Sequence, residues 1–222
     1  MAANFAGCLA GIASAFEDST GHTVVISSGS TGAHYAQIRQ GAPFDIFFAA
    51  DAERPERLEA EGFTVPGSRA TYALGRLVLW ARFLQPGGEP DLATALEHPD
   101  LKHLAIADPD LAPYGRAARQ VLDALDYENE RLVFGRNVAQ TWQFVASGNA
   151  QAGFVARSQV PPGGPPVGAV IPVPADLYDP IRQQVVILKG APDAAAELRE
   201  FVLTGPGRDF ILAGGYAVES AP

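Results

Sequence analysis

The chain has 222 residues, of which 47% are hydrophobic and 18% are charged. Such a chain can bury a substantial core, and its length suits two lobes of roughly 100 residues each. The formal net charge of −9 argues against a nucleic-acid partner, because phosphate contacts require basic patches. The single cysteine excludes an internal disulfide and any multi-thiolate metal site.

Helical spacing and short apolar runs alternate along the first third of the chain. Leu9, Ile12 and Phe16 recur at the spacing of an amphipathic helix, and the β-branched run TVVIS is typical of a strand. The pattern predicts helices over 4–20, 33–40 and 51–61, and strands over 23–27, 44–49 and 72–81.

The same alternation continues to the end of the chain. Strands that alternate with helices indicate an α/β fold, in which mainly parallel sheets are flanked by helices. The pattern predicts helices over 91–98, 113–125, 138–147, 193–203 and 207–213, and strands over 103–107, 131–135, 153–156, 168–172 and 181–189.

Two of the predicted strands, 72–81 and 181–189, are long enough to run between two lobes. We therefore expect hinge strands near 72–81 and 178–189. The first lobe is then discontinuous and the second is continuous: they are expected to comprise 1–80 with 179–222, and 81–178.

Four loops share one layout, in which small or hydroxyl residues stand just before a predicted helix: 2–4, 28–32, 112–115 and 136–139. Helix N-termini offer unpaired N–H groups and about half a positive charge, so several of them aimed at one point bind an anion without lysine or arginine. Any single loop of this kind is more often a plain helix cap, by roughly three to one. Only the combination of the four with a two-lobed topology indicates a binding site.

The chain carries no pattern of a common enzyme. Cys8 lies on a predicted helix with no base nearby in sequence, which is typical of a small buried thiol. His98 and His103 lack the spacing of zinc ligands. No GxSxG, phosphate-binding GxxxxGK[ST] or HExxH motif is present. We expect neither catalysis nor a cofactor.

The motifs in the loops and helices resemble those of a known family. The stretch TGHTVVISSGSTGAHYAQIRQGAPFDIFFAADAERPERL resembles the core signature of periplasmic molybdate-binding proteins of ABC transporters. The segments PGSRATYALGRLVLW, IADPDLAPYGRAA and LTGPGRDFILAGGYAV resemble the same family, so the likeness covers essentially the whole chain.

The resemblance implies the two-lobed class II periplasmic binding protein fold, with the ligand in the cleft between lobes. It also implies a tetrahedral oxyanion held by neutral hydroxyls and backbone amides, with no direct ligand to the metal atom. Carried over by motif, the residues that contact the oxyanion are Asn4, Ser30, Thr31, Tyr114 and the amide of Val138. Ala3 and Ala50 are further candidates, Ala50 through a weaker backbone contact.

Two departures from the family pattern concern the start of the chain. Ala3 stands where a hydroxyl residue is often found, so one donor is absent. The resemblance also implies an export signal and a first apolar strand before the Asn4 loop, where only Met1 and Ala2 stand. We expect both segments upstream of Met1, after a mis-assigned or trimmed start.

The expected function is that of a solute receptor. The resemblance implies a monomeric periplasmic protein that binds molybdate or tungstate and delivers it to an ABC-type membrane permease. Two alternatives stay open: a receptor for sulfate, thiosulfate or another oxyanion, and an intracellular oxyanion-sensing domain on the same fold. Selection against sulfate would come from the size of a rigid cavity.

Overall fold

The computed structural model describes residues 1–85, 91–127 and 131–218. The chain forms two compact units, the first made of Met1–Gly75 with Arg182–Pro222 and the second of Arg76–Ile181. It passes from one unit to the other after Gly75 and returns after Ile181. The sequence pattern predicts these crossings after residues 80 and 178. Within the described ranges, no helix is long and apolar enough to cross a membrane.

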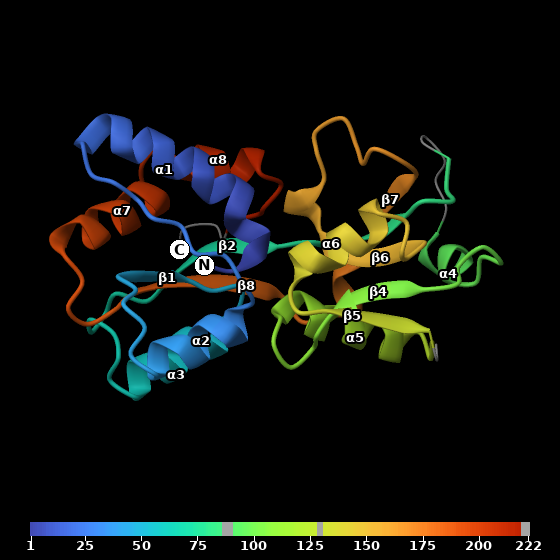
Figure 1. Ribbon diagram of the computed structural model, residues 1–222, viewed down its shortest axis with the longest axis horizontal. Coiled ribbons are helices and arrows are strands. Elements are labelled where there is room, and N and C mark those ends of the chain that lie inside the picture. The colour runs from blue at the N-terminus through green and yellow to red at the C-terminus, as the bar shows by residue number, and fades with distance from the viewer. Residues whose placement is uncertain (86–90, 128–130, 219–222) are drawn as a thin grey trace. The chain divides into compact units, whose positions relative to one another are not determined.

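The first unit is built on a three-stranded sheet with the order β1-β8-β2. Strand β1 runs antiparallel to β8, with Phe47 opposite Val186. Helices α1, α7 and α8 lie on one face of this sheet, and α2 and α3 lie on the other (Figure 1). The bounds are η1 Ala3–Phe5, α1 Ala6–Thr20, α2 Thr31–Arg39, β1 Ile46–Phe48, α3 Glu53–Ala60, β2 Ala70–Gly75, β8 Ile181–Ile187, α7 Asp193–Leu203 and α8 Gly207–Ala213.

The sheet of the first unit has a separate apolar core on each face, because successive side chains of a strand point to opposite sides. Phe48 belongs to the cluster under α1, α7 and α8, together with Leu9 and Leu198. Its neighbour Phe47 belongs to the cluster under α2 and α3, together with Leu58. The short strand β1 is therefore buried on both faces.

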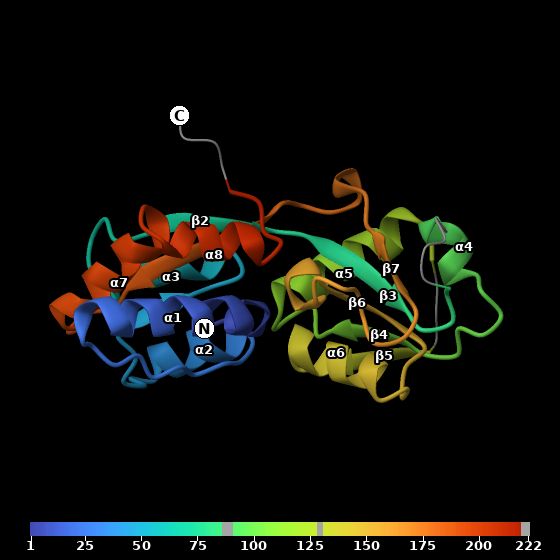
Figure 2. The same ribbon diagram turned by 90° about the horizontal axis from the view of Figure 1, so that it is seen from above.

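The second unit is built on a five-stranded sheet with the order β5-β4-β6-β3-β7. Strand β4 runs parallel to both β5 and β6, whereas β3 runs antiparallel to β6 and β7. Helices α5 and α6 cover opposite faces (Figures 1 and 2). The bounds are β3 Leu77–Ala81, α4 Leu92–Leu96, β4 Leu104–Ala107, α5 Pro113–Ala124, β5 Leu132–Gly135, α6 Val138–Ala146, β6 Ala152–Ala156, η2 Arg157–Gln159, β7 Ala169–Pro172 and η3 Ala175–Leu177.

Two predicted strands differ from those observed. The segment 72–81 is not one strand, because the chain leaves the first sheet at Gly75 and enters the second at Leu77. The segment 23–27 is not a strand at all, and its Val25 is 92% exposed. Among the described residues, its hydrogen bonds join Val24 to the Glu17 carboxylate and Ser27 to Met1, so no ladder forms along it.

Candidate functional site

Backbone hydrogen bonds bring three loops of the first unit together. The Ala2 N–H donates to Phe48 O at 2.9 Å, at the end of β1, and the Ala3 N–H donates to Gly29 O at 2.8 Å. The start of the chain, the loop before α2 and the end of β1 therefore meet at one edge of the sheet. They carry the residues that we call the first-unit donor set: Ala3, Asn4, Ser30, Thr31 and Ala50.

Two hydroxyl groups of this set accept backbone hydrogen bonds. Ser30 is the N-cap of α2, and its Oγ accepts from the Ala33 N–H at 3.2 Å. Thr31 opens the helix, and its Oγ1 accepts from the Ala50 N–H at 3.0 Å. Both side chains are buried. A hydroxyl that accepts one bond still has its own proton to donate, so both can donate to an anion.

The side chain of Asn4 lies in a buried polar network. Its Nδ2 donates to Gln183 Oε1 at 2.8 Å and to the Tyr216 hydroxyl at 2.9 Å, and that hydroxyl donates to Asn4 O at 2.8 Å. Tyr72 also donates to Gln183 Oε1 at 2.9 Å. Both amide protons of Asn4 are thus bonded inside the first unit, and the network fixes the backbone of η1.

Sequence reasoning missed Gln183, Tyr72 and Tyr216 as partners of Asn4. One signal was present, because Gln183 and Gln184 interrupt the apolar run of β8 and Gln183 is fully buried. A buried amide requires hydrogen-bond partners, so a glutamine inside an apolar strand indicates a polar network.

A buried ion pair follows Ala50 directly. The Asp51 carboxylate accepts from the Arg54 N–H in the first turn of α3 at 3.1 Å and also accepts from the Arg54 guanidinium. Burial raises the pKa of Asp51, although the Arg54 charge works in the opposite direction. The arginine therefore compensates the negative charge of Asp51 beside the first-unit donor set.

The second unit holds the remaining candidate residues, Tyr114 and Val138, which we call the second-unit donor set. The loops that carry them follow β4 and β5, which are parallel neighbours with Ala107 opposite Gly135. Because the carboxyl ends of parallel strands meet at one edge, both loops lie at the same edge of this sheet. Tyr114 and Val138 are 2% and 3% exposed.

Local packing fixes the starts of the two helices that carry this set. A Cβ on Gly115 would lie 2.2 Å from Ala107 O, so only glycine lets α5 begin so close to the end of β4. The N-cap of α6 is Asn137, whose side chain accepts from the Gln140 N–H at 3.0 Å. Val138 is therefore the first residue of a capped helix, where the N–H groups have no partner within the helix.

The two donor sets offer hydroxyls and helix N-termini, with no lysine or arginine, while the amide protons of Asn4 are bonded inside the first unit. Across 1–85, 91–127 and 131–218, no group of three or more His, Cys, Asp or Glu side chains is arranged to hold a metal ion. Burial raises the pKa of the Cys8 thiol to about 12, which makes it a poor nucleophile. Hydroxyls and helix N-termini are neutral groups that can donate hydrogen bonds to an anion.

Comparison with known proteins places the chain in a family. The model of the family described as "Bacterial extracellular solute-binding protein" matches residues 1–217. The "Molybdate-binding protein ModA" of Azotobacter vinelandii is 49% identical, and the match covers 99% of this chain and 88% of that protein. The protein of the same name from Rhodobacter capsulatus is 46% identical, with coverages of 99% and 87%.

A solved structure agrees with these relatives. The Azotobacter vinelandii periplasmic molybdate-binding protein superposes with a TM-score of 0.92 at 40% sequence identity, covering 99% of this chain and 98% of that one. The fold is therefore the two-lobed binding-protein fold that the resemblance implied. The chain belongs to the family of bacterial extracellular solute-binding proteins.

Proposed function

We propose that this protein is the molybdate receptor of an ABC transporter. The observation that carries the proposal is the identity of 49% and 46% with two molybdate-binding proteins across 99% of the chain. The chemistry of the candidate residues is consistent with it, because neutral hydroxyl and N–H donors suit a tetrahedral oxyanion.

The residues proposed to contact the anion come from the two donor sets. Ser30 and Thr31 contribute hydroxyls, while Ala3, Asn4 and Ala50 belong to the loops that position them. Tyr114 and the Val138 N–H complete the donors from the second unit. The buried network of Asn4 and the close packing of Gly115 hold these donors in fixed positions.

The fixed positions of these donors account for the proposed selection of molybdate and tungstate over sulfate. Molybdate and tungstate are nearly equal in size, whereas sulfate is smaller with the same shape and charge. A smaller ion leaves some buried donors without a partner, and each unmade hydrogen bond costs about 1–3 kcal/mol. We therefore include tungstate as a second ligand and exclude sulfate.

The proposal extends to the cellular setting. A receptor of this family delivers its anion to a membrane permease, and the solved relative is described as periplasmic. We place this protein in the periplasm as a monomer that carries out no catalysis.

The test is a calorimetric titration of the folded, anion-stripped protein with molybdate, tungstate, sulfate and phosphate. We expect one-to-one binding of molybdate and tungstate and no heat from the other two. Equal binding of sulfate would identify a general oxyanion receptor instead. Absence of binding to all four anions, in a sample whose circular dichroism shows a folded protein, would reject the proposal.

A further inference from the structure

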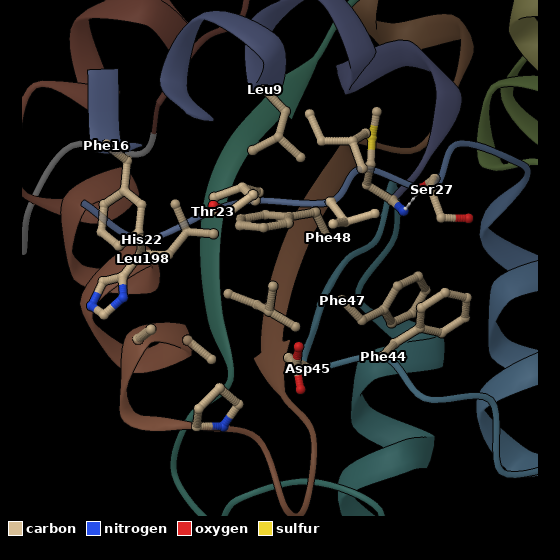
Figure 3. Close-up of a pocket in the computed structure, with 18 of the residues that line it drawn as sticks. Leu9, Phe16, His22, Thr23, Ser27, Phe44, Asp45, Phe47, Phe48 and Leu198 are labelled. Carbon is tan, nitrogen blue, oxygen red and sulfur yellow. Dashed lines mark hydrogen bonds between the residues drawn. The ribbon is translucent and has the colours of Figure 1, made fainter. Parts of the chain in front are cut away.

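The loops that carry the two donor sets have different structures beside them. The segment 22–27, which leads to Ser30 and Thr31, lines a pocket of about 320 Å³ together with β1 (Figure 3). In the second unit, every residue of β6 is buried, and β6 lies between β3 and β4 in the sheet. Strands at the centre of a sheet open less readily than its edges, so β6 is a firm support for neighbouring loops.

The strand from which the chain enters α6 is a weaker support. Within the described residues β5 pairs only with β4, at the edge of the sheet, and its Phe134 is 49% exposed. Two local hydrogen bonds shape the start of the helix: Asn137 accepts from the Gln140 N–H, and Gln140 Oε1 accepts from the Arg136 N–H at 2.7 Å. These bonds join residues at most four apart, so they do not attach the first turn to a central strand.

The side chain of Gln159 makes that attachment. Its Nε2 donates to Val138 O at 3.1 Å, and its Oε1 accepts from the Ala156 N–H at 2.9 Å. Val138 is the first residue of α6, and Ala156 is the last residue of β6. One side-chain amide therefore joins the start of the helix to a buried, doubly paired strand.

Ala156 lies where β6 meets the entry of the chain into the second unit. It is opposite Leu77, the first residue of β3, and the neighbouring Arg157 N–H donates to Arg76 O at 2.9 Å. Arg76 is the first residue of the second unit. Hydrogen bonds therefore lead from the start of α6 through Gln159 to the residue at which the chain enters the unit.

The bond to Val138 O fixes the peptide group that joins Val138 to Ala139. The N–H of this group belongs to Ala139 and keeps a fixed direction relative to the carbonyl, because the peptide group is planar. Val138 and Ala139 are the first two residues of α6, so their N–H groups have no acceptor within the helix. Gln159 thus holds the turn from which both N–H groups project.

We propose that Gln159 is a positioning residue for anion binding, which acts through Val138 without touching the anion. The inference rests on the proposed function, because it assigns Gln159 a role at that site. Selection by size requires donors in fixed positions. Without the bond to Val138 O, the first turn of α6 can shift, so the site binds molybdate less tightly and discriminates less against the smaller sulfate.

The experiment compares Gln159→Met with the matched control Gln151→Met. Gln151 makes a similar bridge beyond the opposite end of α6, where its Oε1 accepts from the His103 N–H at 2.8 Å and its Nε2 donates to Gly148 O at 3.5 Å. We expect both substitutions to lower the melting temperature. Only Gln159→Met should weaken molybdate binding, by about five- to tenfold for one lost hydrogen bond.

The ratio of the sulfate Kd to the molybdate Kd distinguishes positioning from general destabilisation. A smaller folded fraction weakens the apparent binding of both anions by the same factor and leaves the ratio unchanged. Calorimetry gives the molybdate Kd, and competition with molybdate gives the sulfate Kd. We expect the ratio to fall in Gln159→Met and to stay at the parent value in Gln151→Met.

A second variant and a measurement without anion complete the test. Gln159→Glu can accept from the Ala156 N–H but, when ionised, cannot donate to Val138 O, so it should also weaken molybdate binding; Gln151→Glu controls for the added charge. In the anion-free protein, the amide NMR signal of Ala139 should shift in Gln159→Met and not in Gln151→Met.

Two outcomes would overturn the positioning role: an unchanged molybdate affinity and anion ratio in Gln159→Met, or equal losses in Gln159→Met and Gln151→Met. A parent chain that binds none of the anions would reject the proposed function instead. An unchanged Ala139 signal in Gln159→Met would separately show that Gln159 does not hold the start of α6.

Discussion

The Thr31 hydroxyl combines a structural hydrogen bond with the capacity to donate another. It accepts the Ala50 N–H at 3.0 Å, and both residues are almost fully buried. A buried N–H that loses its acceptor costs about 1–3 kcal/mol. The residue therefore ties the end of β1 to the start of α2 whether or not an anion is present.

The substitution Thr31→Val removes the hydroxyl with little change in the volume of the side chain. It therefore tests the hydrogen bond from the Ala50 N–H and the proposed contact with the anion without opening a cavity. We expect the free energy of unfolding to fall by about 1–3 kcal/mol, because the Ala50 N–H loses its acceptor. We also expect weaker molybdate binding. Urea denaturation and calorimetry measure the two quantities. Thr31→Ser keeps the hydroxyl and is the control; equal stability of the valine and serine variants would contradict the structural role of the hydroxyl.

The Cys8 thiol should be unreactive while the protein is folded. Burial raises its pKa to about 12, and the thiolate is the species that attacks alkylating reagents. At pH 8 we expect alkylation by iodoacetamide at least about a hundredfold slower in the folded protein than in urea. Mass spectrometry of timed samples measures the rates. Comparable rates would show that the thiol is accessible and ionised.

At the scale of elements, the N-cap of α6 decides how the Val138 amide is presented. The Asn137 side chain accepts from the Gln140 N–H at 3.0 Å, which aligns the first turn of the helix. An aspartate can accept the same bond but places a negative charge beside the N–H groups of that turn. The two properties, capping and charge, can therefore be varied separately.

We expect Asn137→Ala to lower the free energy of unfolding by about 1 kcal/mol, because the cap is lost. Asn137→Asp should retain the stability of the parent chain and still bind molybdate more weakly, because its carboxylate repels the anion. Thermal unfolding with and without molybdate distinguishes the two. An aspartate variant with undiminished affinity would remove the start of α6 from the binding site.

Residues adjacent to a helix made the exact ends of some helices predictable. The predicted helices 193–203 and 207–213 agree with α7 and α8 at both ends, because Pro192, Gly205 and Pro206 mark the boundaries. The loops before α2, α5 and α6 were found for the same reason, since caps and turns are properties of adjacent residues. Local sequence therefore located the helix starts that carry most of the candidate donors.

Properties that depend on distant residues were not predictable. Whether 23–27 pairs as a strand depends on a partner, and the β-branched run alone contains no information about one. The partners of Asn4 lie 179 and 212 residues away along the chain. The division of 72–81 at Arg76 depends on the change from one sheet to another. Gly75 stands at this point, but a single glycine inside a strand pattern does not indicate that the chain changes sheets.

At the scale of the whole molecule, the stability of the chain that starts at Met1 should depend on pH. Burial lowers the pKa of the Met1 amino group from 8.0 to about 5. The unfolded chain then binds more protons between these values, so the free energy of unfolding increases from pH 5 to pH 8. Burial and the nearby Met1 ammonium also lower the pKa of His34, which acts in the same direction.

We expect the amino group to destabilise the protein by about 3 kcal/mol at pH 5 relative to pH 8, because it titrates between its folded pKa of about 5 and its ordinary value of 8.0. Urea denaturation at intervals of one pH unit measures the change. Acetylation of the Met1 nitrogen removes this titration and should reduce the change with pH. A pH dependence that acetylation does not reduce would contradict the burial of the amino group.

The central strand of the first sheet has a consequence for synthesis on the ribosome. The order β1-β8-β2 places β8 in the middle, yet β8 follows the entire second unit in the chain. The first sheet cannot assemble until Ile181–Ile187 has emerged, whereas the contiguous second unit can already be complete. We therefore expect the nascent chain to fold its second unit before its first. Until the first sheet forms, we expect Phe47 and Phe48 on β1 to be accessible to chaperones that bind apolar segments.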